Sequence, residues 1–246
     1  MSVVRLDIAY DGTDFHGWAR QPGVRTVEGV LTEALGKLLG DEPKLSVAGR
    51  TDAGVHAEGQ VASFHAPDGF DLQRARRALN KMLGPEVAVR RATRAPEGFD
   101  ARFSATGRVY RYRIETSDTP DPFTARFVWE RPGPLRIAAM RAAARRLRGE
   151  HDFASFCRAA DPPASTVRTL RRLSVSESGS RVVVRAEADS FLHQMVRSLV
   201  GTLVRVGEGR LEPAAVADLL AARDRVAAGQ MAPPHGLALV HVQYAK

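Results

Sequence analysis

The sequence predicts an α+β fold, because segments with strand spacing and segments with helical spacing of their apolar residues follow one another along the chain. In residues 1–105 the predicted order is strand, helix, strand, strand, helix, strand, which is the split βαβ order of ferredoxin-like domains. Residues 106–246 resemble a looser version of the same plan. We therefore predict two domains, residues 1–105 and residues 106–246, each with a sheet and helices.

Each element of the first half has its own local signal. Alternating apolar and polar side chains predict a strand over Val3–Tyr10, which ends at an Asp11-Gly12 turn. Thr26 is the expected N-cap of a helix whose apolar residues recur at helical spacing until Gly40. The remaining predicted elements are strands at 45–48 and 60–65, a helix at 72–83 and a strand at 87–93.

The second half has weaker strand signals and one strong helix. Its other predicted elements are strands at 109–115 and 127–129, a helix at 137–147, and a hairpin of strands 166–177 and 181–189. Two adjacent apolar stripes over Phe191–Val206 predict a half-buried helix, with Arg197 at the edge of the buried face. The Pro-containing loops at 118–122 and 161–163 are too short to be interdomain linkers.

The composition excludes several classes of protein. With 44% apolar and 26% charged residues, the chain is ordinary globular material. No apolar run reaches the roughly 18 residues of a transmembrane helix, and residues 1–10 lack a hydrophobic signal region, so we expect a cytoplasmic protein. The single cysteine, Cys157, allows no internal disulfide and no multi-cysteine zinc site. The seven histidines show no paired helical spacing and no dinucleotide or phosphate-loop motif is present, so we expect neither metal nor cofactor.

The basic surplus consists of arginine and lies in the second half. The net charge is +8, from 36 Lys and Arg against 28 Asp and Glu, and only four of the basic residues are lysines. Up to Ala105 there are 14 basic and 14 acidic residues, whereas the rest has 22 basic and 14 acidic. Arginine binds phosphate bidentately and stacks on bases, but an arginine-rich coding bias would give the same composition. If RNA is the partner, we expect this surplus to contact phosphates.

The densest set of functional residue types is the segment Ala48–Ala57, AGRTDAGVHA. Glycines on both sides of an Arg-Thr-Asp core let a ligand approach the backbone closely. Asp52 can act as a nucleophile there, because the guanidinium of Arg50 keeps the acid ionised. The alternative, which residue types alone favour, is that Asp52 caps a turn and Arg50 is solvated.

This segment, together with Tyr10–Trp18 (YDGTDFHGW), resembles the TruA-type tRNA pseudouridine synthases. Further matching pieces follow in order and at compatible spacing, which makes the set far more specific than any single piece. They are GQV at 59–61, FDARFS at 99–104, YRY at 110–112, HDF at 151–153, SFLHQMVR at 190–197, APP at 232–234 and GL at 236–237. One departure is Ala19, where family members usually have Gln, so a polar contact near the RNA is in question.

The resemblance implies the function and the site. It implies isomerisation of uridine to pseudouridine in the anticodon stem-loop of tRNA, at nucleotides 38, 39 and 40, by a homodimer without cofactor or metal. It makes Asp52 the catalytic nucleophile and Tyr110 the aromatic ring that stacks on the target base. Arg50 would help to hold the base out of the RNA helix, and Arg197 would pair with Asp52. The implied fold is that of pseudouridine synthases: two RNA-recognition-like halves that form a continuous, mainly antiparallel sheet flanked by helices.

Two other functions are open to the same residues. A non-catalytic RNA-binding protein could keep the fold and the charge, although an intact Arg-Thr-Asp loop with Tyr110 and Arg197 argues against it. A nucleoside hydrolase could use Asp52, but no second acid is placed to activate water. Simple core packing is the alternative role for the tyrosines, and we favour it for Tyr112.

Overall fold

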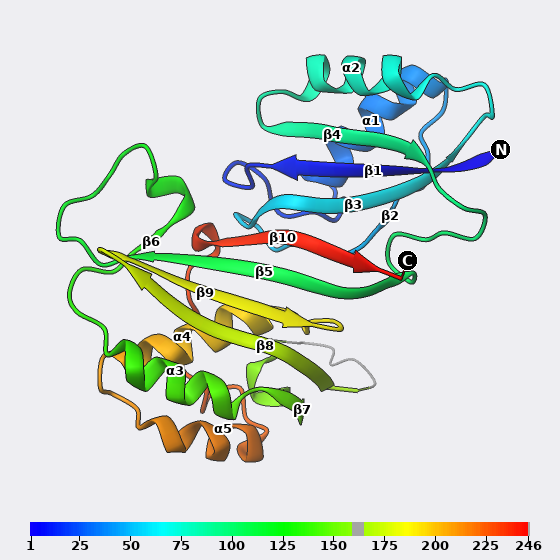
Figure 1. Cartoon of the computed structure of the whole chain (residues 1–246). Coiled ribbons are helices and arrows are strands. Elements are labelled where there is room, and N and C mark those ends of the chain that lie inside the picture. The colour runs from blue at the N-terminus through cyan, green and yellow to red at the C-terminus, as the bar shows by residue number, and fades with distance from the viewer. Residues whose placement is uncertain (159–164, 246) are drawn as a thin grey trace. The chain divides into compact units, whose positions relative to one another are not determined.

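The computed structural model of this protein describes residues 1–158 and 165–245, so the loop predicted at 161–163 lies outside the described residues. The chain divides into two compact units (Figure 1). Unit 1 consists of Met1–Thr106 with Ala238–Lys246, and unit 2 of Gly107–Leu237. Each unit contains a mainly antiparallel sheet and helices, which confirms the predicted α+β class.

Unit 1 has the predicted order of elements in its first hundred residues. Strands β1 and β3 are antiparallel neighbours, β4 lies on the other side of β1, and β2 pairs with β3. One further strand, β10, comes from the end of the chain and runs parallel to β3. The elements are β1 (Ser2–Tyr10), α1 (Val27–Leu39), β2 (Ser46–Val47), β3 (His56–Ala66), α2 (Leu72–Leu83), β4 (Val87–Arg94) and β10 (Leu237–Tyr244).

Both helices of unit 1 begin at a capping side chain. The Thr26 side chain accepts a hydrogen bond from the N–H of Gly29, as its predicted N-cap role requires. Gly40 ends α1 with a φ of 87°, a conformation that glycine adopts without strain. The Asp71 side chain caps α2 by accepting hydrogen bonds from the N–H groups of Gln73 and Arg74. These caps set the helix lengths on either side of the segment that carries Asp52.

Unit 2 is built on the strand order β5-β9-β8-β7, with β6 beside β5. The pairs β5–β9, β9–β8 and β8–β7 are all antiparallel. The strands are β5 (Ala105–Glu115), β6 (Trp129–Glu130), β7 (Gly149–Asp152), β8 (Val167–Ser178) and β9 (Arg181–Ala188), and the helices are α3 (Ile137–Arg146), α4 (Met195–Gly207) and α5 (Val216–Ala222). Helix α3 packs on β8 and on α4.

The long helix of unit 2 begins at Met195, four residues later than predicted. Gln194 has a φ of 60°, in the left-handed region, which interrupts the helical path. Leu192 lies in the loop before the helix, but its side chain is buried. Its apolar side chain therefore fits the helical spacing in the sequence although it is not part of the helix. The strand predicted at 127–129 is also corrected, because Phe127 ends a 3-10 helix and only Trp129 and Glu130 pair with β5.

Some arginines of the basic surplus have structural partners. The Nε of Arg141 donates to the carbonyl of Val175 at 2.9 Å, and Arg148 donates twice to the carbonyl of Leu173, at 3.0 and 2.7 Å. Both carbonyls belong to β8, and both arginines come from α3 and the turn after it. These guanidinium groups therefore satisfy backbone oxygens of the strand and contribute to packing as well as to charge.

No helix within residues 1–158 and 165–245 combines the length and apolar character needed to cross a membrane.

Gly201 provides a test of the packing around α4. A Cβ atom on Gly201 would lie 2.1 Å from the carbonyl oxygen of Gln230, so Gly201→Ala must displace backbone. We expect it to lower the free energy of unfolding by about 1–3 kcal/mol, although Gly→Ala inside a helix ordinarily stabilises by roughly 1 kcal/mol. Urea titration measures the change. The control Gly69→Ala, where a Cβ meets nothing within 4 Å, should change stability by less than about 0.5 kcal/mol. Equal effects of both variants would contradict the close contact.

Candidate functional site

Asp52 lies in the loop between β2 and β3 of unit 1. Its side chain is half-buried, whereas Arg50, two residues earlier, is exposed. The N–H of Ala48 donates to the carbonyl of Val61 at 2.9 Å, and the N–H of Val55 donates to the carbonyl of Asp52 at 3.1 Å. Backbone hydrogen bonds thus hold the loop at its start and around Asp52 itself.

A buried network of polar side chains lies under this loop. The hydroxyl oxygens of Tyr10 and Thr51 are 2.7 Å apart, and Nε2 of Gln60 donates to the carbonyl of Gly49 at 2.6 Å and to the Tyr10 hydroxyl at 3.3 Å. Tyr10, Thr51 and Gln60 are all buried, with Gln60 wholly inaccessible. Because buried polar groups must be paired, this network fixes the backbone on both sides of Arg50 and directly before Asp52.

Burial also sets the protonation of Tyr10. Desolvation raises the pKa of Tyr10 to about 12, and the hydrogen bonds with Thr51 and Gln60 oppose that rise. The hydroxyl therefore keeps its proton throughout the physiological range and can take part in the network as donor and acceptor.

The motif at Tyr10–Trp18 supports the Asp52 loop. The N–H of Trp18 donates to the carbonyl of Thr51 at 3.0 Å, and the N–H of Gly54 donates to the carbonyl of Phe15 at 3.2 Å. Gly17, between Phe15 and Trp18, has a φ of 88°, and a Cβ there would lie 2.8 Å from the Thr51 oxygen and 3.1 Å from the carbonyl carbon of Asp52. Two motifs separated by some thirty residues therefore form one support for Asp52.

Tyr110 and Tyr112 belong to β5 of unit 2 and have different surroundings. Tyr110 is 8% exposed, and its ring makes a T-shaped contact with Phe191, with 5.2 Å between ring centroids. Tyr112 is wholly buried, and its hydroxyl donates to the carbonyl of Pro233 at 2.8 Å. Desolvation raises the pKa of Tyr112, an effect that the positive charge of Arg197 opposes. Tyr112 is thus a packing residue near Arg197.

Arg197 lies in the first turn of α4 and is half-buried. Its Nε donates to the carbonyl of Ala232 at 2.9 Å, while the N–H of Ala232 donates to the carbonyl of Arg197 at 3.1 Å. The adjacent residue Pro233 accepts the hydrogen bond of Tyr112. The segment at 232–233, part of one of the matching motifs, therefore orients the guanidinium of Arg197 in unit 2.

The four predicted site residues fall into two groups. Asp52 and Arg50 belong to unit 1, and Tyr110 and Arg197 belong to unit 2. The predicted pairing of Asp52 with Arg197 joins residues of different units and stays a prediction. Sequence reasoning missed the supporting residues Tyr10, Gln60 and Gly17. All three belong to the motifs that carry the family resemblance, but their contacts are not local in sequence.

No cluster of three or more His, Cys, Asp and Glu side chains that could hold a metal ion occurs in the part of the chain that the structure describes.

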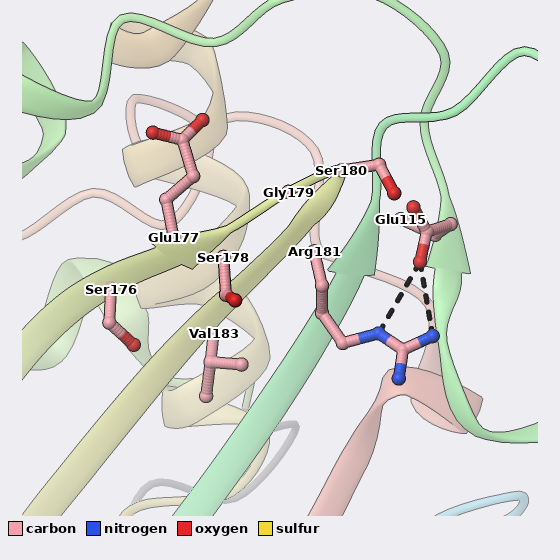
Figure 2. A pocket seen from close by; sticks show the side chains of 8 residues that line it. All are labelled: Glu115, Ser176, Glu177, Ser178, Gly179, Ser180, Arg181 and Val183. Atoms are coloured by element: carbon pink, nitrogen blue, oxygen red, sulfur yellow. Dashed lines mark hydrogen bonds and ion pairs between the residues drawn. The ribbon is translucent and has the colours of Figure 1, made fainter.

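A pocket of about 450 Å³ lies at the turn of the β8–β9 hairpin (Figure 2). Its lining residues are Glu115, Ser176, Glu177, Ser178, Gly179, Ser180, Arg181 and Val183. Arg181 there donates to Glu115 at 3.3 and 3.1 Å. The pocket contains none of the four predicted residues, so we place the candidate site elsewhere, at Asp52.

Comparison with known proteins gives one family. Residues 8–104 and 143–245 match the family model described as tRNA pseudouridine synthase. Similar curated proteins are each called tRNA pseudouridine synthase A. The protein of Acidiphilium cryptum is 50% identical over 242 residues, 97% of this chain and 95% of that protein. The protein of Frankia casuarinae is 50% identical over 98% of this chain and 89% of its own length. The protein of Geobacter sulfurreducens is 42% identical over 99% of this chain and 100% of its own length. The matched segments contain Arg50, Asp52 and Arg197.

The support under Asp52 can be tested with Tyr10→Phe, which removes only the hydroxyl. The change leaves the Thr51 hydroxyl and one Gln60 N–H without their buried partner, so we expect the free energy of unfolding to fall by about 1–2 kcal/mol at pH 7. Because the folded-state pKa of Tyr10 is raised, its contribution is present below pH 10 and is lost as the pH rises through about 12. The gap between wild type and variant should therefore shrink over that range. Urea titrations at pH 7, 10 and 11 measure it, and a gap independent of pH would contradict this account. Ser176→Ala, which removes an exposed hydroxyl, is the control.

Proposed function

This chain belongs to the tRNA pseudouridine synthase family, and we propose that Asp52 is the nucleophile with which it isomerises uridine to pseudouridine in tRNA. The observation that supports Asp52 is the way its loop is held. A hydrogen bond between the Thr51 and Tyr10 hydroxyls and one from the N–H of Trp18 to the Thr51 carbonyl fix the residue before Asp52. Gly17 lies against the Asp52 backbone. A carboxylate must be held this firmly to attack at one atom of a substrate.

The reaction needs few chemical parts. The N1–C1′ glycosidic bond of uridine breaks, the uracil ring turns, and C5 forms the new bond to C1′. C5 loses its proton to solvent, and N1 gains a proton. No atoms other than protons are exchanged, so neither a redox cofactor nor an energy source is needed. A carboxylate could attack the sugar, attack the uracil ring, or promote proton loss from the ribose, and all three routes need Asp52 in its ionised form.

We propose that the target base leaves the RNA stack and is bound by side chains of the predicted site. Unstacking costs about a few kcal/mol, and stacking on an aromatic ring recovers about 1–3 kcal/mol. Tyr110 is the proposed platform, since its T-shaped contact with Phe191 sets the plane of the ring. The exposed Arg50 would hold the base out of the RNA helix, and Arg197 would pair with Asp52.

The finer parts of the proposal come from the family resemblance in the sequence. They are the anticodon stem-loop as target, at nucleotides 38, 39 and 40, and a cytoplasmic homodimer as the working form. The basic surplus beyond Ala105 supports a polyanionic substrate, since each guanidinium near a phosphate releases condensed counterions.

Asp52→Asn tests the nucleophile. The amide keeps the size of the side chain but cannot attack, so we expect pseudouridine formation to fall by about 10³-fold or more. Affinity for tRNA should stay within about twofold, since the loop contacts are kept. Tritium release from C5-labelled uridine in tRNA measures the product, and filter binding measures the affinity.

The exposed Asp118→Asn removes the same charge in unit 2 and should leave both quantities unchanged. Near-normal product from Asp52→Asn would overturn the nucleophile assignment. Absence of product from the wild type, with tRNA still bound, would favour the non-catalytic RNA-binding alternative.

Tyr110→Leu tests the stacking platform. If Tyr110 stacks on the flipped base, turnover at saturating tRNA should fall more than tRNA affinity. The reason is that the ring contacts the base only after the base has left the RNA stack, so the contact stabilises the transition state more than the initial complex. Tyr110→Phe, which keeps the ring, should restore most of the turnover. Single-turnover rates and binding constants separate the two effects. Equal losses of rate and affinity would show that Tyr110 is only a binding contact.

A further inference from the structure

The turn at residues 99–104 exposes an aromatic side chain on a firmly held backbone. Phe103 is 81% exposed, although the turn that carries it is tied down on both sides. Oδ1 of Asp100 accepts hydrogen bonds from the N–H of Arg102 at 2.7 Å, from the N–H of Phe103 at 2.9 Å, and from the Ser46 hydroxyl at 2.8 Å. One carboxylate therefore fixes the backbone of Arg102 and Phe103 and joins it to β2.

Other strands of unit 1 hold the same turn at Ala101, which is completely buried. The N–H of Ala101 donates to the Ser63 hydroxyl of β3 at 3.0 Å, and its carbonyl accepts from the Tyr244 hydroxyl of β10 at 2.8 Å. Desolvation raises the pKa of Asp100, but the hydrogen bonds from Phe103, Ser46 and Arg102 outweigh it and lower the pKa below its usual value. The carboxylate thus stays ionised in the role that the turn requires.

Arg102 lies over the ring that this turn presents. Its guanidinium carbon is 5.4 Å from the centroid of Phe103, and Arg102 is itself exposed. The described residues contain a second strongly exposed phenylalanine, Phe123, which is 91% exposed, but none of their arginines lies over its ring. An aromatic face beside a guanidinium is the combination with which proteins bind a nucleotide, because the ring stacks on the base and the cation pairs with the phosphate.

The size and charge of the surface favour RNA over a second protein chain. A phenylalanine side chain offers about 150–250 Å², whereas a stable protein interface buries about 1,200 Å² or more. The exposed Arg102 brings a positive charge to this surface, and a positive charge attracts a polyanion. One ring and one guanidinium are enough for a single nucleotide.

We propose that Arg102 and Phe103 form a second nucleotide-binding subsite, which takes an unpaired base of the tRNA away from the reacting uridine. Phe103 stacks on that base, and Arg102 contacts the neighbouring phosphate. The subsite rests on the proposed function in one respect, that tRNA is the substrate. It contributes to tRNA affinity and not to the chemical step, since the reacting groups are those at Asp52.

Phe103→Ala tests the subsite in the full-length chain. We expect the Kd for tRNA to rise about 5- to 100-fold, while turnover at saturating tRNA stays within twofold of wild type. Phe103→Trp, which keeps a stacking surface, should retain the affinity. The matched control Phe123→Ala should leave the Kd unchanged. Arg102→Gln should reduce the slope of log Kd against log salt by about 1.

The outcomes separate the alternatives. An unchanged Kd for Phe103→Ala, with pseudouridine still formed by the wild type, would overturn the subsite and leave the proposed function intact. A change of oligomeric mass in light scattering without a change in Kd would show that Phe103 contacts a second copy, which also overturns it. Absence of pseudouridine from the wild type would overturn the proposed function, and the binding comparison would still decide the subsite. Equal thermal midpoints of the variants exclude unfolding as the cause.

Discussion

The structure around Asp52 depends on the buried hydrogen bonds that join Tyr10, Thr51 and Gln60. They connect side chains of β1 and β3 to the carbonyl of Gly49 and to the hydroxyl of Thr51, the two residues on either side of Arg50. A loop with glycines at both ends would otherwise be free to move, since glycine restricts the backbone least. The network takes away that freedom without covering Asp52, which stays half-buried and therefore within reach of a substrate.

The second support is steric. Gly17 and Gly12 let the β1–α1 connection lie directly against the backbone of the Asp52 loop, where a Cβ atom would collide with Thr51 and Val55. Close packing of two loops can leave buried backbone N–H and C=O groups without hydrogen-bond partners. Here the N–H groups of Trp18 and Gly54 donate hydrogen bonds across the contact. The two motifs that carry the family resemblance are thus parts of a single structural device, which explains why both have their particular residue types in this chain.

The arginines of this chain have at least two kinds of role. Arg141 and Arg148 are bound to carbonyl oxygens of β8, and Arg197 to that of Ala232, so their positions are set by the fold. Arg50 and Arg102 are exposed on loops. The net charge of +8 therefore overstates the number of cations available to a polyanion. The arginines that matter for the proposed function are the few that the backbone places beside an aromatic ring or an acid.

The sequence by itself determined most of the local structure and the family. Alternation and helical spacing predicted the element order of unit 1, and the caps at Thr26 and Gly40 gave the bounds of α1, because these signals act between neighbours in sequence. The segments Tyr10–Trp18 and Ala48–Ala57, through the family resemblance, singled out Asp52 as the candidate nucleophile. Prediction failed where a distant contact or one unusual backbone angle decides the outcome. Gln194 in the left-handed region delays α4 until Met195, and no periodicity in the sequence reports that angle.

Only the tertiary structure decided what surrounds Asp52. The parallel placement of β10 on β3, the Gln60 contact with Gly49 and the Gly17 contact with Asp52 join residues from about ten to nearly two hundred positions apart. Such pairs leave no periodic trace in the chain, because each depends on how complete elements pack. Residue types identify the acid, the ring and the guanidinium, but folding alone holds the backbone of each in place for chemistry.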